Sequence, residues 1–276
     1  MKRISYSSLA FAAVVALGLV ASSLAIAQNG LTCPGNTPSP NSAVVLERVF
    51  NDCPASTITT TNNYPTLISI NDTDEGCVGW TNLHVWSFSE DGITPAVFEN
   101  CSHYKFSALF NIGGVAGGGE GGLRVSPWWS LNADGRFMVN AGSGEVACFG
   151  GRLPFYSFTV ANGLHYVAGT DIWLEITYAP HGLTAADPAT ITYKVYYQGN
   201  GYYSPALPFD QGNPAEGHGE YGALYPAHVG GYFQEPNGSG GALFNWTAKW
   251  MNIQYEGPSA TPATSKSWGQ LKTLYR

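Results

Sequence analysis

Alternation of apolar and more polar side chains at every second residue is the feature that most constrains this chain. Ile172, Leu174, Ile176 and Tyr178 follow this pattern, and the segments 104–112 and 190–197 repeat it. A period of two places the apolar side chains on one face of a β-strand. The sequence therefore predicts an all-β fold made of half-buried strands.

Turn-forming residues separate the predicted strands. Gln-Gly-Asn-Gly at 198–201 lies between two tyrosine-rich segments and predicts a hairpin. The glycine-rich segment 113–122 predicts a flexible or unusually tight connection. The segment 208–220 is the longest irregular stretch, and loops of that length tend to carry function or to move.

The composition limits the partners. Only 11% of the residues are charged, whereas glycine, tyrosine and tryptophan are frequent, which is typical of extracellular β-sandwiches. The formal net charge is −7. Such an acidic chain is a poor ligand for a phosphate backbone or an anionic membrane surface. We therefore expect no nucleic-acid partner.

The N-terminus resembles a secretory signal peptide of the kind bacteria use. Lys2 and Arg3 precede an apolar run at 9–24, and Ala25-Ile26-Ala27 supplies small residues before Gln28. Such a run is short for a membrane span, although a retained N-terminal anchor is the alternative. No later segment is apolar enough to span a bilayer. We expect a protein that is secreted or displayed on the cell surface.

Composition and strand pattern divide the chain further. Residues 28–82 form a lead-in with the first strands, and 83–256 form the main sandwich. From 257 to 276 a Pro-, Ser- and Thr-rich linker precedes a basic aromatic tail, which is either frayed or a sorting and docking peptide.

The five cysteines predict disulfides, because an exported protein is oxidised. Cys148 lies in an apolar strand and is expected to be a buried free thiol. Cys33, Cys53, Cys77 and Cys101 remain for two bridges. Pairing Cys33 with Cys53 and Cys77 with Cys101 is preferred among three possibilities that the sequence leaves open.

The order of segments over 83–256 resembles the concanavalin A-like lectin/glucanase superfamily, in its laminin-G-like branch. The likeness rests on the segments 122–129, 134–139, 169–176 and 250–255. It implies an antiparallel jelly-roll β-sandwich, pinned here by disulfides near its N-terminus. Many members of this superfamily bind glycans, often with calcium, and some cleave polysaccharides. Fold alone does not decide among these activities.

Sugar binding requires flat aromatic faces beside polar groups. The candidates lie at strand ends and turns: Trp128, Trp129, Tyr202, Tyr203 and Tyr232. With the resemblance, they predict a non-catalytic, lectin-like module that binds a glycan or another surface polymer. The alternatives are a structural or adhesive surface protein, and a polysaccharide-active hydrolase or lyase.

No complete catalytic motif is present. The nearest approach to the glucanase arrangement is Asp171 with Glu175, which stand about 13 Å apart along a strand and lack the middle carboxylate. A lyase would combine Tyr, His and Arg or Gln. Arg124 and Arg136 are available for that role, but no lyase motif can be matched onto them.

Calcium prefers clustered carboxylate and amide oxygens. The densest cluster is Asn71-Asp72-Thr73-Asp74-Glu75-Gly76. Its carboxylates Asp72, Asp74 and Glu75 are therefore the predicted calcium ligands.

Overall fold

The structure is a computed structural model, and it describes residues 38–74, 77, 79–115, 117–127, 135–151, 153–209, 221–222, 227–237 and 243–257. Several predicted features lie outside the described residues. They are the signal peptide at 1–27, Cys33, Glu75, Trp128, Trp129, most of the loop at 208–220 and residues 258–276 of the tail.

Nearly all the regular structure is β-strand, as the alternating pattern predicts. The strands are β1 (Ser42–Asn51), β2 (Thr57–Asn63), β3 (Leu67–Asp74), β4 (Gly79–Ser89), β5 (Tyr104–Val115), β6 (Glu120–Pro127), β7 (Arg136–Asn140), β8 (Val146–Phe149), β9 (Tyr156–Ser157), β10 (Ile172–Ala179), β11 (Thr190–Tyr197), β12 (Asn200–Tyr203), β13 (Leu207–Pro208), β14 (Ala227–Asn237) and β15 (Phe244–Glu256). One short helix, α2 (Phe158–Asn162), follows β9. Among the described residues, no helix has the length and apolar character needed to span a membrane.

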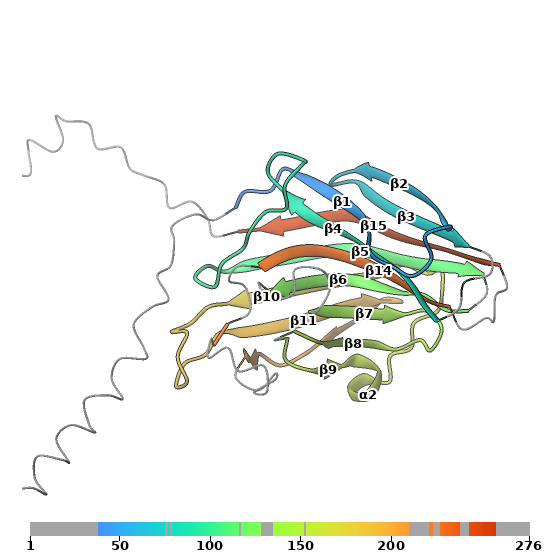
Figure 1. Ribbon diagram of the computed structural model, residues 1–276. Coiled ribbons are helices and arrows are strands. Elements are labelled where there is room, and N and C mark those ends of the chain that lie inside the picture. Colours follow the sequence, from blue (N-terminus) through green and yellow to red (C-terminus); the bar gives the residue numbers. More distant parts are fainter. Residues whose placement is uncertain are drawn as a thin grey trace, which may run out of the picture. The chain divides into compact units, whose positions relative to one another are not determined.

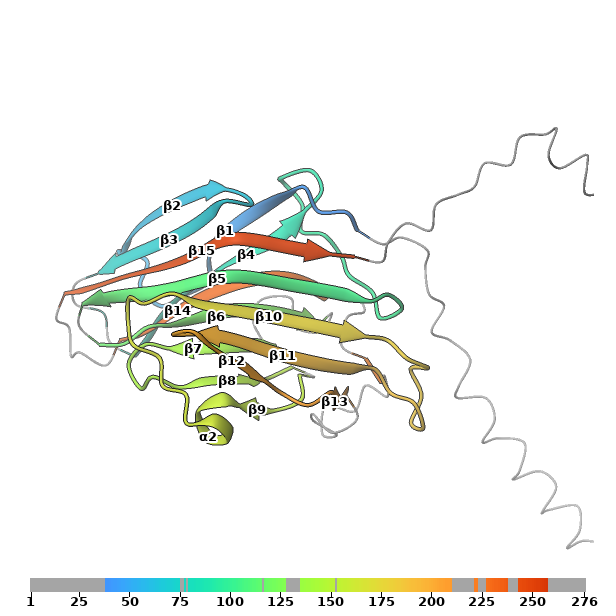
Figure 2. The same ribbon diagram turned by 180° about the vertical axis from the view of Figure 1, so that it is seen from behind.

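The strands form two antiparallel sheets that pack face to face (Figures 1 and 2). The seven-stranded sheet has the order β1-β4-β14-β6-β7-β8-β9. The eight-stranded sheet has the order β12-β11-β10-β5-β15-β3-β2, and β13 pairs with β11. This sandwich confirms the expected all-β jelly roll.

Aromatic side chains fill the space between the sheets. Trp86 of β4 meets Trp250 of β15 edge to face, with ring centroids 6.1 Å apart, and Phe110 of β5 packs on Trp250 at 5.4 Å. All three rings are fully buried. Rings of this size contribute most of the apolar area that holds a sandwich together.

The glycine-rich segment is mostly strand. Gly113 and Gly114 end β5, and Gly121 and Gly122 belong to β6. A side chain on Gly114 would run into the indole of Trp246. The connection expected over 113–122 is therefore limited to the residues between β5 and β6. The glycines within the two strands allow neighbouring side chains and backbone to pack closely against them.

The expected hairpin is confirmed. Gln198 and Gly199 have φ of 49° and 81°, and they join β11 to β12. Left-handed φ at both central residues is what a tight hairpin turn requires.

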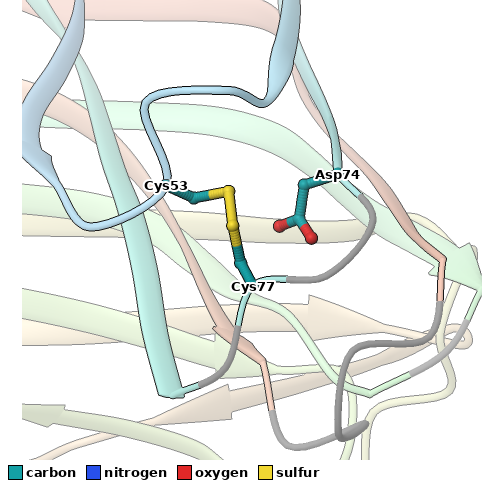
Figure 3. A group of neighbouring side chains, drawn as sticks. All are labelled: Cys53, Asp74 and Cys77. Carbon is teal, nitrogen blue, oxygen red and sulfur yellow. A yellow bond between two sulfur atoms is a disulfide. The ribbon is translucent and has the colours of Figure 1, made fainter.

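The preferred disulfide pairing is wrong. Cys53 is bonded to Cys77, with Cα atoms 6.0 Å apart (Figure 3). Cys101 is disulfide-bonded as well. Cys148 is free and fully buried, as expected. Strand pairing explains why Cys53 bonds to Cys77, because the pairing of β2 with β3 brings the end of β3 back to the loop that carries Cys53.

Candidate functional site

Polar side chains gather on the outward face of the seven-stranded sheet, over β14 and its two neighbours. In β6, Leu123 and Val125 enter the core, so Arg124 points to the opposite face. In β14, Val229 and Phe233 enter the core. The alternation therefore turns the polar side chains of both strands outward.

The register of the sheet places these side chains beside one another. Gly230 of β14 lies between Ser87 of β4 and Arg124 of β6. Tyr232 and His228 flank Gly230 at two residues on either side of it. Glycine at 230 carries no side chain, and a Cβ atom there would collide with the backbone carbonyl of Trp86, so β4 approaches the chain closely between the phenol and the imidazole.

Arg124 lies at the centre of this face. It donates to Ser126 Oγ at 2.6 Å and to Ser87 Oγ at 2.5 Å, and it is fully buried. Burial lowers the pKa of Arg124 to about 9, so the guanidinium remains charged at neutral pH. A buried cation in such a place is suited to an anionic group.

A second arginine lies opposite the first. Arg136 of β7 is the register partner of Arg124. It donates to Glu120 Oε1 at 2.7 Å, and its guanidinium carbon lies 5.1 Å from the ring centre of Tyr232. Burial raises the pKa of Glu120, although Arg136 acts in the opposite direction. The ion pair holds Arg136 over the tyrosine ring.

Tyr232 and His228 have the protonation states that proton transfer requires. The Tyr232 hydroxyl is buried with no hydrogen-bond partner among the described residues, and burial raises its pKa well above the usual value. Tyr232 is therefore a neutral phenol at neutral pH. Burial, followed by the nearby Arg124, lowers the pKa of His228, which makes it a neutral imidazole. The first can donate a proton and the second can accept one.

We call these residues the β14 cluster: Glu120, Arg124, Arg136, His228 and Tyr232. Arg124 and Tyr232 are fully buried, whereas His228 and Arg136 retain contact with solvent. The cluster joins a cationic centre to a neutral base and a neutral acid. This combination can polarise an anionic group and move a proton on each side of it.

The three predicted sugar-binding aromatics that the structure describes do not form one platform. Tyr232 belongs to the β14 cluster, and its ring is covered. Tyr202 is half-buried against the core, and Tyr203 is 58% exposed at the edge of the other sheet. Lys194 Nζ lies 5.5 Å from the Tyr203 ring centre. These three tyrosines therefore belong to different surroundings.

Asp171 and Glu175 lie on the outward face of the eight-stranded sheet, away from the β14 cluster. Asp171 is exposed and accepts from Asn111 Nδ2 at 2.8 Å. Glu175 Oε2 lies 3.9 Å from Lys105 Nζ. Each carboxylate thus has its own polar partner in the sheet surface.

Two of the three predicted calcium ligands, Asp72 and Asp74, are described, and both are buried. Asp72 is fully buried and its Oδ2 accepts from Asn82 Nδ2 at 2.7 Å. Asp74 approaches Cys53 and Cys77, and the three residues could in principle share a metal ion (Figure 3). The disulfide consumes both thiols, so neither sulfur is available as a thiolate. Calcium at Asp72 and Asp74 stays a prediction.

Comparison with known proteins yields likeness of fold only. No protein-family model matches the chain, and no curated protein resembles it in sequence. An alginate lyase of polysaccharide lyase family 7 is 11% identical, with a TM-score of 0.39 over 75% of this chain and 84% of its own. The alginate lyase from Corynebacterium sp. is 10% identical, with a TM-score of 0.39 over 75% and 83%. The marine family 7 alginate lyase from Zobellia galactanivorans is 7% identical, with a TM-score of 0.41 over 79% and 96%.

The expectation of a non-catalytic, lectin-like module is corrected. The three solved structures named above are alginate lyases and not lectins, and they give no support to the laminin-G-like branch. The geometry of the site is consistent with this correction. A sugar platform needs an exposed aromatic face, yet the ring of Tyr232 is buried beneath Arg136.

Sequence reasoning found part of this cluster. Tyr232, Arg124 and Arg136 were visible as candidates, but His228 and Glu120 were not. The signal for all five is the same, a polar residue at an outward position of an alternating strand. What the sequence does not show is that β14 inserts between β4 and β6, because that pairing joins segments more than a hundred residues apart.

Proposed function

We propose that this protein is a polysaccharide lyase that cleaves a uronic acid polymer by β-elimination at the β14 cluster. The observation that carries the proposal is the arrangement around Gly230. His228 and Tyr232 lie on either side of it, about 13 Å apart at their Cα atoms, and Arg124 lies alongside. A uronate that reached this buried position would have His228 as a base at one side, Tyr232 as an acid at the other and Arg124 as a cation for its carboxylate.

The reaction needs only groups that the cluster supplies. His228 takes the proton from the sugar carbon next to the carboxylate. The electron pair of that bond forms a carbon–carbon double bond, and the glycosidic carbon–oxygen bond of the adjacent carbon breaks. Tyr232 gives its hydroxyl proton to the departing oxygen. Each such proton transfer contributes about 100-fold or more to the rate.

Arg124 and Arg136 make the proposal specific for an acidic sugar. The carbon–hydrogen bond next to a carboxylate becomes acidic enough to cleave only when the carboxylate charge is neutralised. Arg124 provides that charge within an otherwise acidic chain, and Arg136, which is ion-paired with Glu120, lies at the register position beside it.

A hydrolase fits the cluster less well. Glycoside hydrolysis by the usual route needs two carboxyl groups flanking one bond. The β14 cluster contains a single carboxylate, Glu120, and Arg136 binds it at 2.7 Å. The elimination route needs no second carboxylate.

Export completes the proposal, because polymers of this kind lie outside the cell. The predicted signal peptide at 1–27 would deliver the enzyme to them.

The test is the release of unsaturated uronate, followed by ultraviolet absorbance, from alginate, polygalacturonate and hyaluronan. We expect cleavage of at least one polymer. Tyr232→Phe should lower kcat by about 100-fold or more, because it removes only the acidic hydroxyl. Tyr203→Phe makes the same change outside the cluster and should leave kcat unchanged.

Two results would contradict the proposal. One is the absence of any unsaturated product from all three polymers. The other is full activity in both Tyr232→Phe and His228→Gln, measured on proteins whose circular dichroism matches that of the wild type.

A further inference from the structure

Figure 2 views the eight-stranded sheet from its outward side. A row of apolar side chains crosses this face. Its members are successive register partners on five neighbouring strands: Tyr196 of β11, Trp173 of β10, Leu109 of β5, Met251 of β15 and Leu67 of β3. We call this set the apolar row. With strands about 4.8 Å apart, the row is about 19 Å long and perpendicular to the strands.

The apolar row is a surface feature and not part of the core. Tyr196 is 51% exposed, and the other four side chains are half-buried. Their neighbours along each strand enter the core and are fully buried, as Trp250 and Phe110 show. The sandwich is therefore stable without any need to place two aromatic rings on its outer face.

Polar side chains border the apolar row on both sides. On one side Lys194 and Glu175 are register partners. On the other side Asn111 donates to Asp171 at 2.8 Å and pairs in register with Lys249. The ionisable groups of this face balance one another: Lys105, Lys194 and Lys249 against Asp171, Glu175 and Glu256.

This pattern matches the chemistry of a sugar chain. Pyranose rings present carbon–hydrogen faces that pack on aromatic and aliphatic side chains, and hydroxyl edges that hydrogen-bond to amides and carboxylates. A protein partner would need a broader apolar patch, because stable interfaces bury about 800 Å² on each side. The apolar row is only one side chain wide.

We infer that the outward face of the eight-stranded sheet is a second, non-catalytic binding surface for an extended polysaccharide. The chain lies along the apolar row, with its rings on Trp173 and Tyr196 and its hydroxyl groups on Asn111 and Glu175. The surface keeps the polymer on the protein between cleavage events at the opposite sheet. The kind of polymer rests on the proposed function, but the surface itself is independent of the β14 cluster.

Affinity electrophoresis in native gels containing alginate, polygalacturonate or neutral β-glucan separates binding from cleavage. The full chain carrying Tyr232→Phe is used throughout, so that the polymer in the gel stays intact. We expect at least one polymer to retard it. Adding Trp173→Ala and Tyr196→Ala should weaken this apparent affinity by about tenfold. Phe155→Ala removes a ring that is 66% exposed elsewhere and is the matched control.

The rate of polymer cleavage is the second measurement, and it uses protein that retains the native Tyr232. Trp173→Ala with Tyr196→Ala should slow the degradation of long polymer and leave the cleavage of short oligosaccharides unchanged. Equal retardation of the Trp173/Tyr196 variant and the control would overturn the inference, as would the absence of retardation in every gel. A dimer in light scattering that Tyr196→Ala dissociates would also overturn it, because the face would then be a contact between copies of the chain.

The two proposals fail separately. Suppose that Tyr232→Phe abolishes cleavage but the Trp173 and Tyr196 substitutions do not change polymer binding. That result refutes only the second binding surface. Suppose instead that the polymer binds through Trp173 and Tyr196 but no unsaturated product forms. That result refutes only the proposed lyase activity.

Discussion

Asp72 is a charged residue inside the sandwich whose neighbours all favour its ionised form. It is fully buried, and its Oδ2 lies 2.7 Å from Asn82 Nδ2 and 3.0 Å from His84 Nε2. The backbone N–H of Arg48 donates to His84 Nδ1 at 3.1 Å, so His84 carries its proton on Nε2 and donates to Asp72. Burial acts to raise the pKa of Asp72, but the hydrogen bonds from His84, Asn82 and Ser56 outweigh it and the pKa is lowered.

Asp72→Asn should therefore destabilise the protein in a pH-dependent way. The variant keeps the size of the side chain but loses the charge that accepts from His84. At about pH 7 we expect a loss of about 2 kcal/mol in the free energy of unfolding, since hydrogen bonds to charged groups contribute about 1.5–3 kcal/mol. Urea denaturation measures this loss.

The direction of the pH effect follows from the lowered pKa. Between the folded pKa and the unfolded value of 3.8, the unfolded chain binds more protons, so stability rises with pH. The contribution of Asp72 is complete above 3.8 and disappears as the pH falls through the folded pKa. The difference between wild type and Asp72→Asn must therefore shrink as the pH falls below 3.8 toward the folded pKa. A difference that stayed constant would show that the charge of Asp72 does not contribute.

At the scale of the element, β14 determines the site because it lies between β4 and β6. Its position depends on Gly231, which faces the core where Trp86 and Trp250 meet. A Cβ atom on Gly231 would collide with Trp86 Nε1 and would come within 2.5 Å of Trp250 Nε1. Only glycine allows the strand to pass this close to both indoles.

Gly231→Ala should lower the free energy of unfolding by about 2 kcal/mol, because overpacking a core costs about 1–3 kcal/mol. Gly142→Ala is the control, since its Cβ would lie 3.4 Å from the nearest atom in an exposed turn. We expect a change within about 0.5 kcal/mol there. Thermal unfolding followed by tryptophan fluorescence measures both. Equal effects would show that the indole pair adapts to the added methyl group.

The sequence predicted where the strands lie better than it predicted which strands pair with one another. The strands at 172–179 and 190–197, and the hairpin between β11 and β12, follow from alternation and turn chemistry, which are local. The contacts of Arg124 with Ser87 and of Arg136 with Tyr232 depend on the register between distant strands. Alternation shows which face a side chain occupies, but not which strand lies beside it. The fold class was therefore predictable from the sequence. The gathering of the β14 cluster at one place was not, because it depends on which strands are neighbours.

At the scale of the whole molecule, one covalent bond joins the two ends of an early loop. Cys53 and Cys77 are separated by 24 residues. The bond restricts the unfolded chain, and a loop of this length contributes about 3 kcal/mol. The loop includes β2 and β3, which form one edge of the eight-stranded sheet.

The double variant Cys53→Ser with Cys77→Ser should lose about 3 kcal/mol of unfolding free energy. Reduction of the wild type in denaturant should cost at least as much, because it also breaks the disulfide of Cys101. Mass spectrometry of unreduced peptides checks the pairing directly. A peptide that links Cys53 to Cys33 would contradict the structure, whereas the Cys148 thiol should become reactive only on unfolding, because burial raises its pKa.

The placement of the last two strands has a consequence for biosynthesis. β14 lies inside the seven-stranded sheet and β15 inside the eight-stranded sheet, so neither sheet is continuous until both have been made. A nascent chain that ends before Ala227 leaves β4 and β6 without their shared neighbour, and β5 and β3 likewise. The sandwich therefore cannot be completed before β15 has been synthesised. Until β14 and β15 emerge, the polypeptide lacks the strands that join the two parts of each sheet, so the earlier strands stay open to non-native pairing.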